Sequence, residues 1–148
     1  MPTHARAPIL LGVGLSAAAL ALTGCAAGGA TEMPIGDVAV GACFTPDATG
    51  LVALVDDCTA PHRYEATARI PVDADARPDD ASLQATADDA CPAAFRERLG
   101  VDPIASTEYV SAAIVPGAEA WDAGARSIIC AVARADGAVA TTAVPAAD

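Results

Sequence analysis

Apolar and polar positions along the chain predict several short strands and one long helix. In residues 64–72 the two kinds alternate, and one face would carry Tyr64, Ala66, Ala68, Ile70 and Val72. The opposite face would carry Glu65, Thr67 and Arg69, a pattern typical of a half-buried antiparallel strand. Shorter apolar stretches predict further strands at residues 38–44, 51–55, 108–115 and 126–134.

An apolar residue recurs at every fourth position between residues 80 and 100, which predicts a helix with one buried face. This row consists of Leu83, Ala87, Cys91, Phe95 and Leu99, so Cys91 should face the core. Asp79 or Asp80 would cap the start of the helix, and Gly100 would end it. Pro92 interrupts the pattern, because an internal proline costs about 3 kcal/mol. We expect a kinked helix or two helices that meet at Pro92.

The first 24 residues have the pattern of an export signal. A weakly basic start precedes an uncharged apolar run, residues 9–22, that is about 14 residues long and too short to span a bilayer. The run ends in Leu22-Thr23-Gly24-Cys25, which resembles a bacterial lipoprotein signal, or lipobox. The alternative is a plain signal peptide with an incidental cysteine. We expect Cys25 to carry a diacylglyceryl anchor, with acyl chains such as palmitate, that holds the protein on the outer face of the cell membrane.

Five cysteines are an awkward number for an exported protein, and lipidation of Cys25 leaves four. Four cysteines in an oxidising compartment suggest two disulfides, for which the sequence alone allows three pairings. The helix face with Cys91 would pack on the strand face with Cys130, and Cys43 and Cys58 flank the hairpin of the first two strands. We therefore predict the pairs Cys43–Cys58 and Cys91–Cys130.

These elements predict a small α+β fold, in which an antiparallel sheet of about five strands carries one helix on its apolar face and two disulfides cross-link the chain. Residues 25–35, which are small and include glycine, would form a lipidated flexible tether. Residues 36–144 would form one extracytoplasmic domain with a single core. The last four residues, 145–148, would be frayed.

The chain is acidic, with a formal net charge of −11 and no lysine. This charge argues against a nucleic-acid partner, because there is no basic surface to displace phosphate counterions. It also argues against a domain that lies flat on an anionic leaflet. The simplest interpretation is that the charge keeps an alanine-rich domain soluble.

Three short segments resemble the actinobacterial septum-formation domain, a family of membrane-tethered or lipid-anchored extracytoplasmic proteins. Residues 40–44, Val-Gly-Ala-Cys-Phe, resemble its opening Val-Gly-Asp-Cys-Phe. Residues 55–65 resemble its Val-x-x-Cys-x-x-Pro-His-x-x-Glu signature, and residues 116–130 its ending Pro…Trp-x-x-Gly-x-Arg-x-x-x-Cys. The chain departs from the family at Ala42 and Ala125, where aspartate is common; if those acids serve a ligand, this member has lost it. The resemblance implies a role near the septum or the cell wall.

His62, Trp121 and Arg126 are the candidate binding or structural residues. A Cys/His nucleophile pair needs a free thiolate beside the imidazole, whereas Cys58 is predicted in a disulfide, so we expect a structural role for His62. Trp121 would be a platform for a sugar or a partner if exposed, and a lid on the core edge if buried. Arg126 lies in the same motif and has the same two interpretations.

We expect no catalytic residue, no metal and no cofactor. Zinc held by Cys58 and His62 is disfavoured, because export favours cysteine oxidation. The acidic loop of Asp73, Asp75, Asp79 and Asp80 offers oxygen ligands for calcium, but the EF-hand pattern fails at three positions. A solvated acidic loop is the preferred interpretation.

Three functions follow from these features. The first is a non-enzymatic envelope lipoprotein that binds or scaffolds other envelope or division proteins, with the membrane as partner through its anchor. The second is a module that binds a small ligand or a peptidoglycan fragment, for which a concave pocket near Trp121 would be evidence. The third is an envelope enzyme that uses His62.

Overall fold

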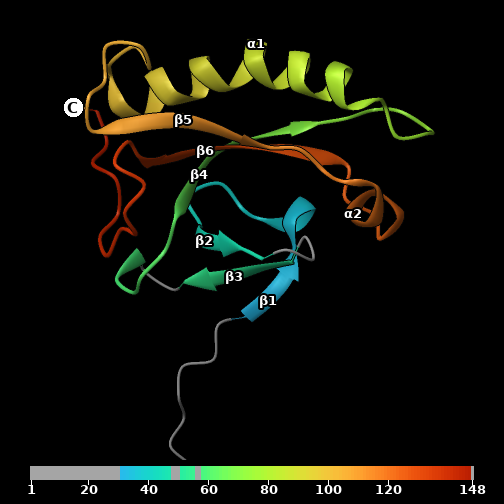
Figure 1. The fold of residues 1–148 in the computed structure, drawn as a ribbon, viewed down its shortest axis with the longest axis horizontal. Coiled ribbons are helices and arrows are strands. Elements are labelled where there is room, and N and C mark those ends of the chain that lie inside the picture. The colour runs from blue at the N-terminus through green and yellow to red at the C-terminus, as the bar shows by residue number, and fades with distance from the viewer. Residues whose placement is uncertain (1–30, 48–50, 56–57, 148) are drawn as a thin grey trace, which may run out of the picture.

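Six antiparallel strands form one sheet in the part of the chain that the computed structural model describes, residues 31–47, 51–55 and 58–147. The strand order is β1-β3-β2-β4-β6-β5, and a long helix lies across one face (Figure 1). The strands are β1 (Thr31–Pro34), β2 (Cys43–Pro46), β3 (Leu51–Val55), β4 (Tyr64–Pro71), β5 (Tyr109–Ile114) and β6 (Ser127–Arg134). The helices are the 3-10 turn η1 (Ile35–Asp37), α1 (Asp80–Leu99) and α2 (Ala118–Asp122). The predicted α+β class is confirmed, with one strand more than expected.

The start of the described chain is structured, although residues 25–35 were expected to be a tether. Strand β1 pairs antiparallel with β3 along its whole length. Ile35 follows it and is buried in the core. Residues 31–35 therefore belong to the domain, because they gain strand hydrogen bonds and apolar burial that a local pattern does not reveal. The expected signal, Cys25 and the tether up to residue 30 lie outside the described residues.

The strand expected at residues 38–44 begins only at Cys43. The preceding turn is held by the amide of Val38, which donates to the carbonyl of Ile35, and by Gly41, whose φ of 86° is readily adopted by glycine. Val38 is nevertheless fully buried. Val38 is apolar because it occupies a core position within a turn. A short apolar run in the sequence looks the same in such a turn as in a strand.

Helix α1 is one continuous helix, so the alternative of two helices meeting at Pro92 is wrong. Asp79 caps it by accepting a hydrogen bond from the Ser82 amide at 2.9 Å, and Gly100 ends it in the left-handed conformation with φ 71°. The inner face is held on both sides of Pro92 by the Cys91–Cys130 disulfide and by fully buried Phe95. Such tertiary contacts offset the cost of the internal proline.

The sheet is buried on both faces at β6. Ile128 and Cys130 pack with the inner face of α1, whereas Ile129 and Ala131 pack on the other side with Phe44 and its neighbours in η1, β2 and β3. The first six residues of β6 are all buried. A central strand covered on both sides reads as a continuous apolar run, as residues 128–132 do.

Strand β4 does not keep the single alternating face that its sequence predicts. Its register with β6 shifts between Ala66 and Ala68, which leaves Thr67 as an extra residue in a bulge. Ala66 therefore packs in the cluster around Phe44, while Ala68 packs toward α1. Glu65, expected on the polar face, is 3% exposed.

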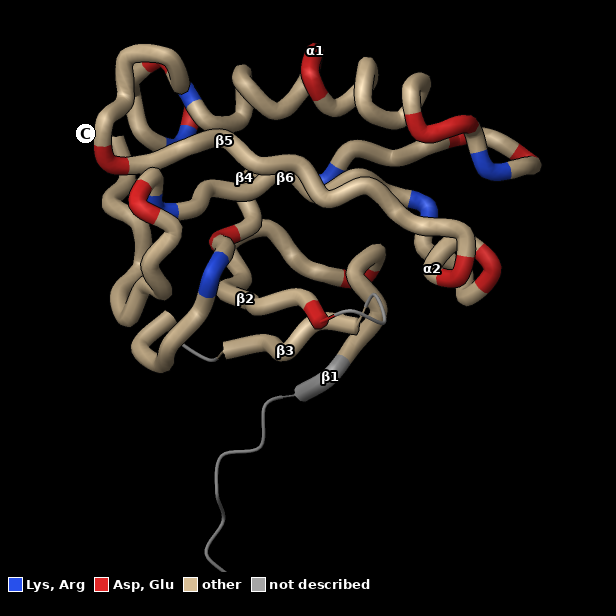
Figure 2. Tube along the Cα trace, in the orientation of Figure 1, with Lys and Arg blue, Asp and Glu red and all other residues tan. Residues whose placement is uncertain are grey.

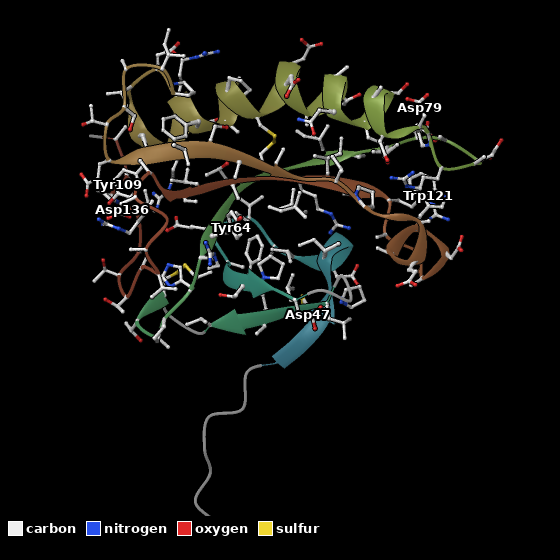
Figure 3. The ribbon with its side chains drawn as sticks, in the orientation of Figure 1. Asp47, Tyr64, Asp79, Tyr109, Trp121 and Asp136 are labelled. Carbon is white, nitrogen blue, oxygen red and sulfur yellow. A yellow bond between two sulfur atoms is a disulfide. The ribbon has the colours of Figure 1, made fainter. Side chains whose placement is uncertain are left out.

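Both predicted disulfides are present (Figure 3). Cys43–Cys58 closes the β2–β3 hairpin, with 5.3 Å between the Cα atoms. Cys91–Cys130 joins α1 to β6, with 5.0 Å between the Cα atoms. Disulfides are typical of proteins that fold in an oxidising compartment, so this pairing indicates an extracytoplasmic domain.

The C-terminal segment packs back on the domain. Ala140 forms an antiparallel bridge with His62, and Val144 is buried. The amide of Ala147 donates to the carbonyl of Arg98 at 2.9 Å, so the expected frayed tail is bonded to the end of α1 up to this residue. Asp148 lies outside the described residues. No helix among the described residues has the length and apolar character to span a membrane.

Candidate functional site

His62 lies inside the fold. It is 1% exposed, and its backbone pairs with Ala140 through hydrogen bonds of 2.9 and 2.8 Å. Its Nδ1 donates to the carbonyl of Ala60 at 2.9 Å, which requires the proton on that nitrogen. Its Nε2 has no partner among the described residues. The ring is held by its own turn and does not reach solvent.

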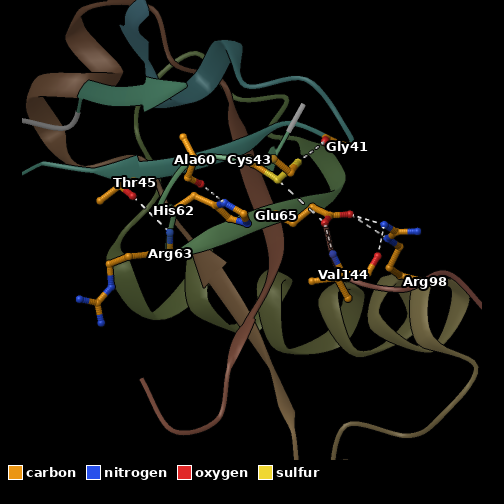
Figure 4. Close-up of a disulfide and its surroundings, with 10 residues drawn as sticks. Gly41, Cys43, Thr45, Ala60, His62, Arg63, Glu65, Arg98 and Val144 are labelled. Carbon is orange, nitrogen blue, oxygen red and sulfur yellow. Dashed lines mark hydrogen bonds and ion pairs between the residues drawn. A yellow bond between two sulfur atoms is a disulfide. The ribbon is translucent and has the colours of Figure 1, made fainter. Parts of the chain in front are cut away.

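The residues that come together near His62 are Cys43, Cys58 and Glu65, whose ligand atoms lie within 4.8 Å of one another (Figure 4). The two sulfurs are bonded to each other, so neither is the thiolate that a metal or a nucleophile pair needs. The carboxylate of Glu65 accepts hydrogen bonds from Arg98 and from the amide of Val144. This cluster is therefore a cross-linked structural core.

Trp121 and Arg126 form one unit, and Trp121 lies at the α2 end of the sheet (Figure 3). The indole, in α2, is 4% exposed, and the Arg126 guanidinium lies over its ring, 4.0 Å from the centroid. Arg126 Nη1 also donates to the carbonyls of Trp121 and Ala125. Gly124 makes the intervening turn with φ 101°. The spacing Trp-x-x-Gly-x-Arg thus brings the guanidinium back over the indole.

An open groove of about 660 Å³ lies beside this unit, where β4 ends and β6 begins. Its walls are Arg69, Pro71, Val72, Asp73, Ala74, Arg126 and Ser127. The Nε of Arg69 donates at 3.0 Å to the hydroxyl of Ser127, which is 4% exposed. The sequence analysis did not single out Arg69 or Ser127 as site residues. Their separation of 58 positions leaves no local signal, and only the pairing of β4 with β6 joins them.

The acidic loop before α1 is largely occupied by structural contacts. Asp79 caps the helix, and hydrogen bonds from the backbone and side chain of Ser82 hold its pKa below the usual range. Asp80 pairs with Arg77, which also donates to the carbonyl of Pro116 at 2.9 Å. Asp73 lies apart from these, on the wall of the groove. Figure 2 shows acidic positions on α1, on α2 and in this loop, with arginines between them.

The two departures from the family motifs differ in burial. Ala125 is 4% exposed and lies directly against Gly36 of η1, where an added Cβ would be 2.7 Å from the Ala125 Cβ. Ala42 is half-buried beside the cluster around Phe44. Neither residue lines the groove.

The comparisons with known proteins identify the family of this chain. The family model described as septum formation matches residues 40–148, the greater part of the chain. No curated protein and no solved structure matches the chain. The matched region includes both disulfides, the His62 turn and the Trp121–Arg126 unit. The chain belongs to the septum formation family.

Proposed function

We propose that this protein is a lipid-anchored, non-enzymatic binding or scaffolding protein on the outer face of the cell membrane, with a role in septum formation. The observation that carries the proposal is the pairing of Cys43 with Cys58 and of Cys91 with Cys130. This pairing supports an oxidising location. It leaves Cys25 as the cysteine available for an acyl anchor, at the end of its lipobox-like sequence.

The same pairing supports binding rather than catalysis. A Cys/His nucleophile at this position would need a free Cys58 thiolate beside His62, whereas Cys58 is bonded to Cys43. The imidazole is buried and donates to a carbonyl of its own turn. These contacts support a structural role for His62.

The anchor is tested by metabolic labelling of the native host with an alkyne analogue of palmitate. We expect label on the wild-type protein and none on Cys25→Ser. The matched control is the double variant Cys43→Ser/Cys58→Ser, which removes a disulfide and should keep the label. A variant with residues 1–25 replaced by an ordinary cleavable secretory signal should be released to the medium. Equal labelling of wild type and Cys25→Ser would refute the anchor.

The binding role is tested by crosslinking in intact cells together with fluorescence localisation of the full chain. We expect specific adducts with other envelope proteins and enrichment at the division site. Titration of the unreduced protein should find the four cysteines of the two disulfides unreactive. Turnover of an envelope substrate that His62→Ala removes, with the fold intact by circular dichroism, would contradict the non-enzymatic role.

A second function, a module for a small ligand, is favoured by the groove beside Trp121. It is concave, open and lined by two arginines, Arg69 near the end of β4 and Arg126 just before β6. Arginine is well suited to fork-like recognition of oxyanions.

A further inference from the structure

We propose that the groove between the end of β4 and the start of β6 is an anion-binding site, in which Arg69 and Arg126 together receive a carboxylate or phosphate group. The inference rests on the proposed binding function and names the chemical class of its ligand. Both arginines line the same hollow of about 660 Å³. Two arginines on one hollow give it a local positive charge, which favours an anion.

Arg126 is positioned in advance of any ligand. Its guanidinium is stacked on the buried Trp121 ring at 4.0 Å, and its Nη1 is held by two carbonyl oxygens. Its Nε and Nη2 have no protein partner in the described part of the chain and are free to donate. A guanidinium fixed in this way loses little side-chain entropy on binding an oxyanion.

Arg69 is positioned from the neighbouring strand. Its Nε donates at 3.0 Å to the hydroxyl of Ser127, which also lines the groove. Its nearest acid is Asp37, at 4.0 Å from Nη2, and the Asp37 side chain is 66% exposed. An ion pair of this length and exposure is weak, so a ligand anion can compete with it.

The ion pairs of the described arginines show which guanidinium groups a ligand could reach without displacing a close carboxylate. Arg77, Arg96, Arg98 and Arg134 each pair with a carboxylate at 3.3 Å or less. Among the described residues, neither Arg126 nor Arg63 has a carboxylate partner. Arg63 lies in a different hollow, beside Tyr64 and Arg134, and so provides a matched control.

Backbone pairing between β4 and β6 holds the residues that line the groove. The amide of Val72 donates to the carbonyl of Arg126 at 2.8 Å, and Pro71 is in register with Ser127. Sites on paired strands hold their geometry better than sites on loops. Pro71, Val72 and Ala74 add an apolar wall, which favours an anion with a small apolar substituent. Asp73 on the same wall opposes the anion and should limit its affinity.

The test uses the full chain in detergent, titrated at constant ionic strength with acetyl-alanyl-alanine, which carries a carboxylate, and with inorganic phosphate. Chloride serves as the control anion. Trp121 is the only tryptophan, so its fluorescence reports directly on Arg126, and the arginine Nε–H signals in nuclear magnetic resonance report on both guanidinium groups. We expect saturable changes with at least one oxyanion. The oxyanion that binds more tightly shows whether the site prefers a carboxylate or a phosphate group.

Arg126→Met and Arg69→Met should each weaken binding by about tenfold or more, as expected for loss of charge-assisted hydrogen bonds. Arg63→Met should leave the affinity unchanged, and Asp73→Asn should raise it. Near-ultraviolet circular dichroism checks that Arg126→Met keeps its fold. Arg69→Met tests the site independently, because it is Arg126 and not Arg69 that stacks on the indole. Absence of saturation with both oxyanions, or equal affinity in Arg126→Met, Arg69→Met and Arg63→Met, would overturn the site.

Crosslinking in cells separates this inference from the proposed function. If Arg126→Met loses the oxyanion but keeps its envelope adducts, the site exists and the scaffold acts through another surface. If wild type forms adducts yet binds neither oxyanion, the site is refuted and the scaffold stands. If wild type binds an oxyanion but forms no adducts, the scaffold is refuted and the site stands.

Discussion

Arg98, at the end of α1, forms an ion pair with Glu65, at the start of β4, with its Nε and Nη2 at 2.9 and 2.5 Å from one carboxylate oxygen. The same Nη2 donates to the carbonyl of Val144 at 2.6 Å. The second oxygen of Glu65 accepts from the amide of Val144 at 2.8 Å (Figure 4). One pair of charges thus joins the helix, the sheet and the C-terminal segment.

Removal of Arg98 should destabilise the fold more than removal of Glu65. Glu65 is 3% exposed and would be left as a buried, uncompensated charge, whereas the Arg98 side chain is 27% exposed and can reach water. We expect Arg98→Met to lower the free energy of unfolding by about 2–3 kcal/mol, near the lower end for a broken buried pair. Glu65→Gln, which keeps the shape and one acceptor, should lower it by less. Urea unfolding of the two variants measures both values.

The matched control for Arg98 is Arg96 on the same helix. Its pair with Asp102 has side chains 50% and 46% exposed, so Arg96→Met should change stability by no more than about 1 kcal/mol. Equal losses in Arg96→Met and Arg98→Met would mean that burial of the Glu65 pair has no energetic consequence.

The two disulfides should contribute unequally. Cys43–Cys58 spans 15 positions and Cys91–Cys130 spans 39. Loop-closure entropy gives about 3 and about 4 kcal/mol respectively, because the longer loop restricts the unfolded chain more. The variant Cys91→Ala/Cys130→Ala should therefore have a lower free energy of unfolding than Cys43→Ala/Cys58→Ala. The reverse order in denaturant unfolding would indicate that packing around the shorter bridge dominates.

Gly36 should tolerate no larger residue, because η1 crosses the start of β6 at close range. An added Cβ would lie 2.7 Å from both the Cα and the Cβ of Ala125. We expect Gly36→Ala to cost about 1–3 kcal/mol, as overpacking does. Gly117→Ala is the control, since nothing lies within 4 Å of its Cβ position and its φ is −67°. Thermal unfolding that shifts equally in the two variants would refute the close contact.

The Asp136 carboxylate should make part of the stability depend on acid pH. The side chain of Arg134, and then the amide of Ala138, lower the pKa of Asp136 to about 2 from an ordinary value of 3.8. A carboxyl with a lowered folded pKa stabilises the fold above its unfolded pKa and loses this contribution as the pH falls through the folded one. The difference in Tm between wild type and Asp136→Asn should therefore be constant above about pH 5 and shrink between pH 4 and pH 2. A difference that does not vary with pH would contradict the assigned hydrogen bonds.

Much of the fold could be predicted because the relevant interactions are local. The apolar row with Cys91 set the buried face of α1, and the capping residues Asp79 and Gly100 set its ends. A helix face and a strand face then sufficed to pair Cys91 with Cys130. The four cysteines, with the motifs around them, also sufficed to identify the family.

What the sequence by itself determined was the long helix, most of the strands, the disulfide partners and the family, because these depend on periodicity, caps and spacing within short segments. Only the tertiary structure decided which side chains meet across long separations. The bulge at Thr67 turned Glu65 toward Arg98, and the pairing of β4 with β6 set Arg69 and Arg126 around one groove. Strand partners lie far apart in the sequence, and a register shift of one residue, as at the bulge, turns the following side chains to the other face of the sheet.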